Sequence, residues 1–136
     1  MAKTFTAAFA QTPKTSSVVS TVASTGIDTL SPTGLFLCTA GAEGAIVTSL
    51  KAIPRSTCSK TRLYLWKTAN GSSDKYMIGS VSLAAYTTSS EDAPVQADFG
   101  FTEEFPLRLA AGDSLYVGIA VNATGGIVFN AQYTDF

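Results

Sequence analysis

A short glycine-rich stretch, AGAEG at residues 40–44, is the first place in this sequence where chemistry could reside. Such a loop can cradle a phosphate when a helix follows it, because the amides of the first helical turn then face the anion. The residues after Gly44 read AIVTSLKAI, which is rich in β-branched side chains and alternates between apolar and polar positions. This pattern predicts a strand, so we interpret 40–44 as a turn whose glycines supply positive-φ positions.

The sequence contains few side chains that are suited to acid–base catalysis or to metal binding. The chain contains no histidine, which removes the commonest general base and metal ligand and excludes Ser-His-Asp and Cys-His nucleophile systems. Ten acidic residues leave a two-carboxylate glycosidase formally open. Most of them lie beside turn residues, and we interpret these as solvated carboxylates: Asp28, Glu43, Asp74, Glu91, Asp92 and Asp113. We therefore expect no enzyme, no catalytic residue, no metal and no cofactor.

The two cysteines, Cys38 and Cys58, are predicted to be free thiols. If the strand with Cys38 forms a meander with the next two strands, the cysteines lie two strand spacings apart, about 9.6 Å. A disulfide tolerates a Cα separation of only about 6.8 Å. A reducing cytosol would favour the same unbridged state.

Strands are the elements that must position these residues, because the apolar pattern has a period of two along most of the chain. No stretch supports an amphipathic helix of about ten residues. The alternating segments are bounded by turn residues and comprise 46–53, 60–67, 76–85, 95–101, 114–122 and 127–133. Short strands at this spacing predict an all-β fold, an antiparallel β-sandwich of jelly-roll type.

Strict alternation also assigns each side chain to one face of its strand. It predicts two sets of residues that share a face: Ile46 with Thr48, Leu50 and Ala52; and Met77 with Val81 and Leu83. A third set is predicted to share a face that lies in the core: Leu115, Val117, Ile119 and Val121.

The segment 60–67 carries Arg62, Tyr64 and Trp66 on one face, opposite its leucines. Because arginine is rarely buried, this face is expected to point outward. Three readings remain open: a stacking platform for sugars or single-stranded nucleic acid, a surface that a neighbouring subunit covers, and a Trp66 tucked under a long loop of its own chain. The three residues are candidate partner contacts.

The first 33 residues differ in composition from the alternating segments that follow. Ser, Thr and small residues dominate them, and Pro13 and Pro32 interrupt them. We divide the chain into 1–33 and a sandwich domain, 34–136. Residues 1–33 are either an ordinary first strand with a long connection or an extended N-terminal arm that adds to a neighbouring subunit. Phe5 and Phe9 would then anchor the arm as further partner contacts.

The composition favours assembly over catalysis. Hydrophobic residues make up 46% of the 136 residues and charged residues only 14%, against roughly 25% in typical soluble domains. A net charge of −1 implies no nucleic-acid partner. No stretch is long and apolar enough for a membrane span, and the start MAKTFTAAFAQTPK is too polar for a signal peptide. We therefore expect a soluble protein made in a cytoplasm.

The order of five sequence elements resembles small all-β virion proteins of tailed bacteriophages and prophages. The elements are FLCTAGAEGAIVTSLKAI, TRLYLW, APVQADFGF, FPLRLAAGDSLYVGIAV and FNAQYTDF. The resemblance covers residues 34–136, and it is the order of all five elements that makes it specific, because Ala-Gly-Asp turns alone occur in many jelly rolls.

This resemblance implies a non-enzymatic virion structural protein, a capsid decoration or cement protein on the head surface that is held in the host cytoplasm until assembly. Its partners would be the major capsid protein and copies of itself, as a trimer or dimer, with no nucleic acid and no membrane. The alternative from a different class is a receptor- or carbohydrate-binding module associated with a tail or fibre.

Overall fold

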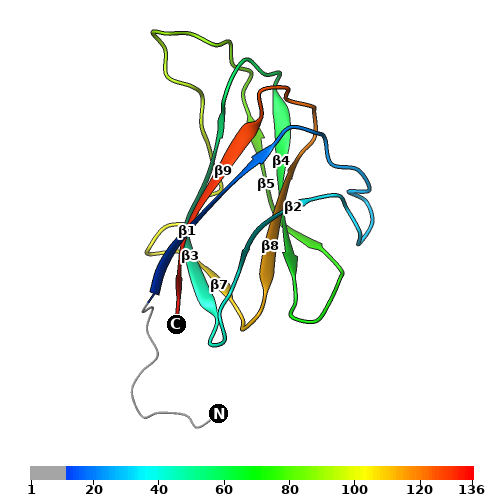
Figure 1. Cartoon of the computed structure of the whole chain (residues 1–136), viewed down its shortest axis with the longest axis vertical. Coiled ribbons are helices and arrows are strands. Elements are labelled where there is room, and N and C mark those ends of the chain that lie inside the picture. Colours follow the sequence, from blue (N-terminus) through cyan, green and yellow to red (C-terminus); the bar gives the residue numbers. More distant parts are fainter. Residues whose placement is uncertain (1–11) are drawn as a thin grey trace.

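The computed structural model describes residues 12–136, which form two antiparallel sheets packed face to face (Figure 1). Sheet A has the order β1-β9-β3-β6, with β7 also paired to β3, and sheet B has the order β2-β8-β4-β5. Sheet A contains β1 (Thr12–Ser20), β3 (Ala45–Pro54), β6 (Ala97–Asp98), β7 (Leu107–Leu109) and β9 (Ile127–Asp135). Sheet B contains β2 (Leu35–Thr39), β4 (Thr61–Thr68), β5 (Tyr76–Leu83) and β8 (Ser114–Ile119). The predicted all-β antiparallel sandwich is confirmed, and its jelly-roll form stays a prediction.

The core lies between the two sheets and is built from alternate residues of their central strands. Sheet B contributes Leu63 and Leu65 from β4 and Val117 from β8, all fully buried. Leu50 of β3 and Phe129 of β9 face them from sheet A and are equally buried. Full burial of each such side chain contributes about 1.5–3 kcal/mol to stability.

Three β-bulges interrupt the strands, and those in β3 and β5 correct faces that strict alternation predicted. Each inserts one extra residue, Leu37 in β2, Thr48 in β3 and Ile78 in β5. In β3 the bulge moves Ile46 to the face opposite Leu50, so the predicted grouping of Ile46 and Thr48 with Leu50 is wrong. A bulge reverses the in–out alternation of all residues beyond it, which a periodic pattern does not reveal.

The predicted grouping of Met77 with Val81 and Leu83 is wrong for the same reason, because Met77 lies opposite Trp66 on the outer face and Val81 lies opposite Leu63 on the core face.

The prediction for Val121 is also wrong. Strand β8 ends at Ile119, and Val121 is 44% exposed. Its backbone N–H donates instead to Thr61 Oγ1 at 3.1 Å.

Of the two readings of the N-terminal segment, the first strand with a long connection describes residues 12–33. Strand β1 pairs with β9 along its whole length, from Thr12 opposite Asp135 to Ser20 opposite Ile127. The sandwich therefore includes residues 12–20, which lie outside the predicted 34–136 domain. Phe5 and Phe9 lie outside the described residues.

The stretch at 40–44 is a turn, as predicted. The Gly44 N–H donates to the Gly41 carbonyl at 3.1 Å, and β3 begins at the next residue. Gly44 has φ +88°, and a Cβ there would lie 2.6 Å from the Leu109 carbonyl oxygen. Both observations explain the glycine, because a side chain would be strained and would also clash with the neighbouring strand.

Cys38 and Cys58 are free, as predicted, but the meander proposed for them is wrong. Strands β2 and β4 lie in sheet B with β8 between them, whereas β3 lies in sheet A. Burial raises the pKa of the Cys38 thiol to about 11, with a smaller contribution from Asp135. Cys38 is therefore protonated at neutral pH and is a poor nucleophile.

Two carboxylates hold the ends of strands together. Asp135 lies 2.6 Å from Lys14 Nζ and accepts a hydrogen bond from the Gly41 N–H at 3.1 Å. Asp113, which we expected to be solvated, is buried and accepts a hydrogen bond from the Ala110 N–H at 3.1 Å. Asp135 thus joins β1, β9 and the turn before β3 at one end of sheet A.

We expect Val117→Asp to abolish folding, because it places an unpaired carboxylate in the core at a cost above about 4 kcal/mol. The matched control is Val121→Asp, which makes the same change just beyond the end of β8 and should cost about 0.5 kcal/mol. Soluble yield and thermal unfolding measure both. An equal loss of soluble yield and of Tm in the two variants would contradict the assigned end of the core.

Asp135 should make stability depend on pH in the acid range. The hydrogen bond from Lys14 lowers the pKa of Asp135 below its ordinary value of 3.8, with the Gly41 amide acting in the same direction and burial opposing them. The stabilisation is therefore complete above pH 3.8 and is lost as the pH falls through the lowered pKa. We expect Asp135→Asn to lower Tm at neutral pH and this difference to shrink toward about pH 2. A difference that is constant with pH would contradict the role of the charge.

Candidate functional site

A row of large side chains crosses the outer face of sheet B, one from each strand. The registers place Phe36 beside Tyr116, Tyr116 beside Trp66, and Trp66 beside Met77. We call these four residues the cross-strand row. Phe36 and Tyr116 make an edge-to-face contact with ring centroids 5.7 Å apart, and Lys75 Nζ lies 4.9 Å from the centre of the Tyr116 ring.

The two ends of the row are open and its middle is covered. Phe36 is 51% and Met77 40% exposed, whereas Trp66 is only 1% exposed. The Trp66 ring lies over two glycines: a Cβ at Gly118 would be 2.8 Å from it, and one at Gly34 would be 3.1 Å away. The absence of side chains at these two positions leaves the space that the indole ring occupies.

The connection between β1 and β2, residues 21–34, covers this part of sheet B. Two of the hydrogen bonds that hold its backbone run from the Ser24 N–H to the Ile119 carbonyl at 2.8 Å and from the Lys75 N–H to the Leu30 carbonyl at 2.9 Å. Figure 1 shows the connection in light blue extending from the end of β1 and returning to β2. Of the three readings of Trp66, the one with the ring tucked under a loop of its own chain describes its position.

The candidate contacts Arg62, Tyr64 and Trp66 do share one face, and they stack in that order. The Arg62 guanidinium lies 5.4 Å from the Tyr64 ring centre, and the Tyr64 and Trp66 rings are stacked with centroids 5.3 Å apart. Only Arg62 is exposed, and its Nε donates to Ser80 Oγ at 2.8 Å. As placed, Tyr64 and Trp66 offer a partner almost no surface.

A second feature, which the sequence analysis did not identify, lies where the edges of the two sheets meet. Strands β1 and β2 are the edge strands on this side, and the Ser16 hydroxyl donates to the Leu37 carbonyl between them. Beyond Ser20 the chain leaves β9 and runs beside the end of β8, where the Thr21 carbonyl accepts from the Ala123 N–H at 3.0 Å. At this end of the sandwich, the segment after β1 is therefore separated from β9.

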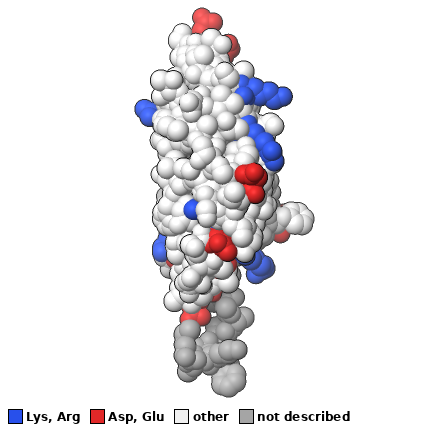
Figure 2. Space-filling view, turned by 90° about the vertical axis from the view of Figure 1, so that its right-hand side faces the viewer, with Lys and Arg blue, Asp and Glu red and all other residues white. Residues whose placement is uncertain are grey.

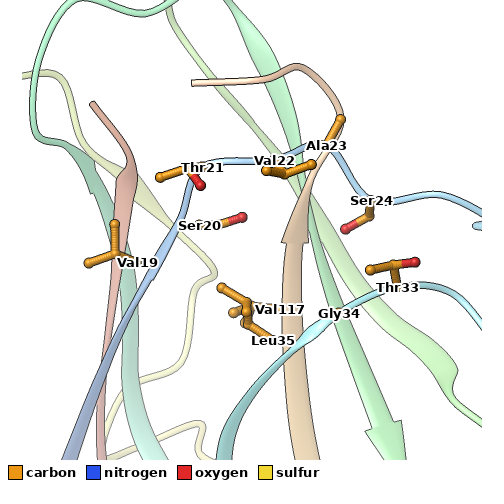
Figure 3. Close-up of a pocket in the computed structure, with 10 residues that line it drawn as sticks. All are labelled: Val19, Ser20, Thr21, Val22, Ala23, Ser24, Thr33, Gly34, Leu35 and Val117. Carbon is orange, nitrogen blue, oxygen red and sulfur yellow. The ribbon is translucent and has the colours of Figure 1, made fainter. Parts of the chain in front are cut away.

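The separation leaves a hollow of about 170 Å³ between residues 19–24 and 33–35, with Val117 also in its lining. Figure 3 shows the two segments on opposite sides of the hollow, with the Ser20 side chain between them. We call this hollow, with the partly exposed Val19, Val22 and Leu35 around it, the apolar seam. No charged residue lines it, and it is smaller than the roughly 300–1,000 Å³ of small-molecule sites.

Charged side chains are sparse on the surface. Figure 2 shows a face that is mostly uncharged, with scattered acidic residues and a few basic side chains along one edge. Within residues 12–136 there is no group of His, Cys, Asp or Glu residues that could hold a metal ion. The same residues contain no helix that could span a membrane.

Comparisons of this chain with protein-family models, with curated proteins and with solved structures found no match. The candidate site therefore rests on its own geometry.

The position of Trp66 can be tested with a glycine substitution. We expect Gly118→Ala to cost about 1–3 kcal/mol and to lower Tm by roughly 3–10 °C, because the added methyl group would press on the indole ring and the Ser24 side chain. Gly79→Ala is the control, since a Cβ there would meet Phe99 and Leu65 only at ordinary distances of 3.6 Å or more. Equal Tm values for the two variants would mean that the ring does not lie over Gly118.

Proposed function

We propose that this chain is a non-enzymatic structural protein of a tailed-phage particle, and specifically a capsid decoration or cement protein on the head. The observation that carries the proposal is the apolar seam, because it is an uncharged surface suited to a protein partner and too small for most small ligands. The resemblance of residues 34–136 to small virion proteins supplies the identity of the partner, the major capsid protein.

The seam combines exposed apolar side chains with a recess. Val22 is 71% exposed and lies on the segment that lines the hollow, so a partner side chain that enters the hollow would also cover it. Apolar area buried in this way contributes about 25 cal/mol per Å² before the cost of association. One such contact is weak, and the proposal depends on many copies acting on one shell.

The rest of the molecule fits a passive, rigid role. Two sheets with a continuous buried core resist deformation, and the low charge limits repulsion between neighbouring copies on a crowded surface. In this proposal copies of the chain bridge adjacent capsid subunits, and copies also associate with one another.

We expect the purified chain to bind heads that were assembled without it and to raise their resistance to heat. Val22→Asp should weaken this binding at least about tenfold, since it places a charge on the seam, and should leave Tm unchanged because the side chain is exposed. Phe105→Asp is the matched control: Phe105 is 74% exposed and lies in the connection between β6 and β7, away from the seam. Cosedimentation with heads measures binding.

The N-terminal segment can be tested in the same assay. Deleting residues 1–11 leaves β1 intact, so a loss of binding without a loss of Tm would support Phe5 and Phe9 as contacts. Failure of the full chain to bind heads, together with binding to tails or to a glycan array, would replace the proposal by the tail or fibre module.

A further inference from the structure

Strand β5 is an edge strand without charged residues or proline and, within the described part of the chain, without a hydrogen bond to the other sheet. It is the last strand of sheet B, and within residues 12–136 its backbone pairs only with β4. Its eight residues, YMIGSVSL, include no charged residue and no proline. Unprotected edges of this kind present free N–H and C=O groups to another strand.

The other edges of the sandwich differ in ways that prevent strand addition. Strand β1 carries Pro13 and Lys14 on its exposed edge. Strand β2 is adjacent to β1, to which the Leu37 carbonyl is hydrogen-bonded. Strands β6 and β7 have only two and three residues. Proline, lysine, short length and β-bulges are the usual devices against edge pairing. Of these β5 has only the bulge at Ile78, and the residues from Gly79 to Leu83 pair regularly with β4.

The exposed side chains of β5 are apolar as well. Tyr76 is 50% and Ile78 39% exposed, and Met77 between them is the open end of the cross-strand row. Leu30, 46% exposed, belongs to the connection that is hydrogen-bonded to Lys75 just before the strand. Three consecutive exposed apolar residues on a strand edge indicate a surface that another molecule covers.

We propose that β5 pairs antiparallel with β5 of a second copy, which joins the two four-stranded sheets into one. Charge favours an identical partner, because two uncharged strands meet without opposing like charges and the whole chain carries a net charge of only −1. A two-fold dimer of this kind also leaves no β5 edge free, so association stops at two copies.

This inference rests on the self-association part of the proposed function and names its surface. The test uses purified full-length chain without heads, so its failure is distinguishable from a failure to bind the shell. Edge pairing buries less than about 1,200 Å² and belongs to the weak class of interfaces. We therefore expect sedimentation analysis to show a shift from monomer to dimer between about 1 and about 200 μM.

Substitutions on the edge should abolish this shift. Ile78→Lys should weaken dimerisation at least about tenfold with little change in Tm, and Met77→Lys is a second variant at the neighbouring position. Phe105→Lys, at a more exposed apolar position outside β5, should dimerise like the unchanged chain.

Hydrogen exchange identifies the paired strand directly. Amides of residues 76–83 should become protected as the concentration rises, whereas those of residues 12–20 should not. The proposal is overturned if the chain stays monomeric, if both lysine variants at positions 77 and 78 dimerise normally, or if protection appears at β1 rather than at β5.

Discussion

The packing of Trp66 against Gly118 and Gly34 is the interaction on which the rest of this structure depends. A tryptophan on the outer face of a sheet exposes a large apolar area to water unless another part of the chain covers it. Here the 21–34 connection covers it and is fixed in place by backbone bonds to Ile119 and Lys75. A segment without strand or helix thereby becomes part of the fold, and sheet B is buried on both faces along β4.

The path of this connection determines where the molecule can make contacts. Because it crosses the middle of sheet B, large apolar side chains remain open mainly toward the two edges of the sheet. One edge borders the apolar seam, where the connection leaves β1, and the other is β5. A subunit with one surface for a shell and another for a second copy would need contact sites on two separate sides. In the proposed role, the apolar seam and β5 make the contacts with other molecules, and the covered centre of sheet B supports them.

The sequence predicted much of the fold and less of the site. Alternation identified β3, β4, β8 and β9, because burial of one sheet face leaves a period of two. It did not show the extra residues Thr48 and Ile78, since a bulge depends on the partner strand rather than on composition. The sequence places Tyr64 and Trp66 on the correct face. It does not show that Trp66 is buried, because this burial depends on Gly118, which is distant in the sequence, and on the path of the 21–34 connection. Lys14 and Asp135 pair across 121 positions, which no local pattern reveals.

The most direct measurement is a cryo-electron microscopy reconstruction of phage heads with this chain bound. The proposed role predicts a sandwich on the outer surface of the shell, with the seam at Val19, Val22 and Leu35 against the capsid protein and β5 turned toward a second copy. A head without this sandwich, or a sandwich located on the tail or bound with the seam facing solvent, would contradict it.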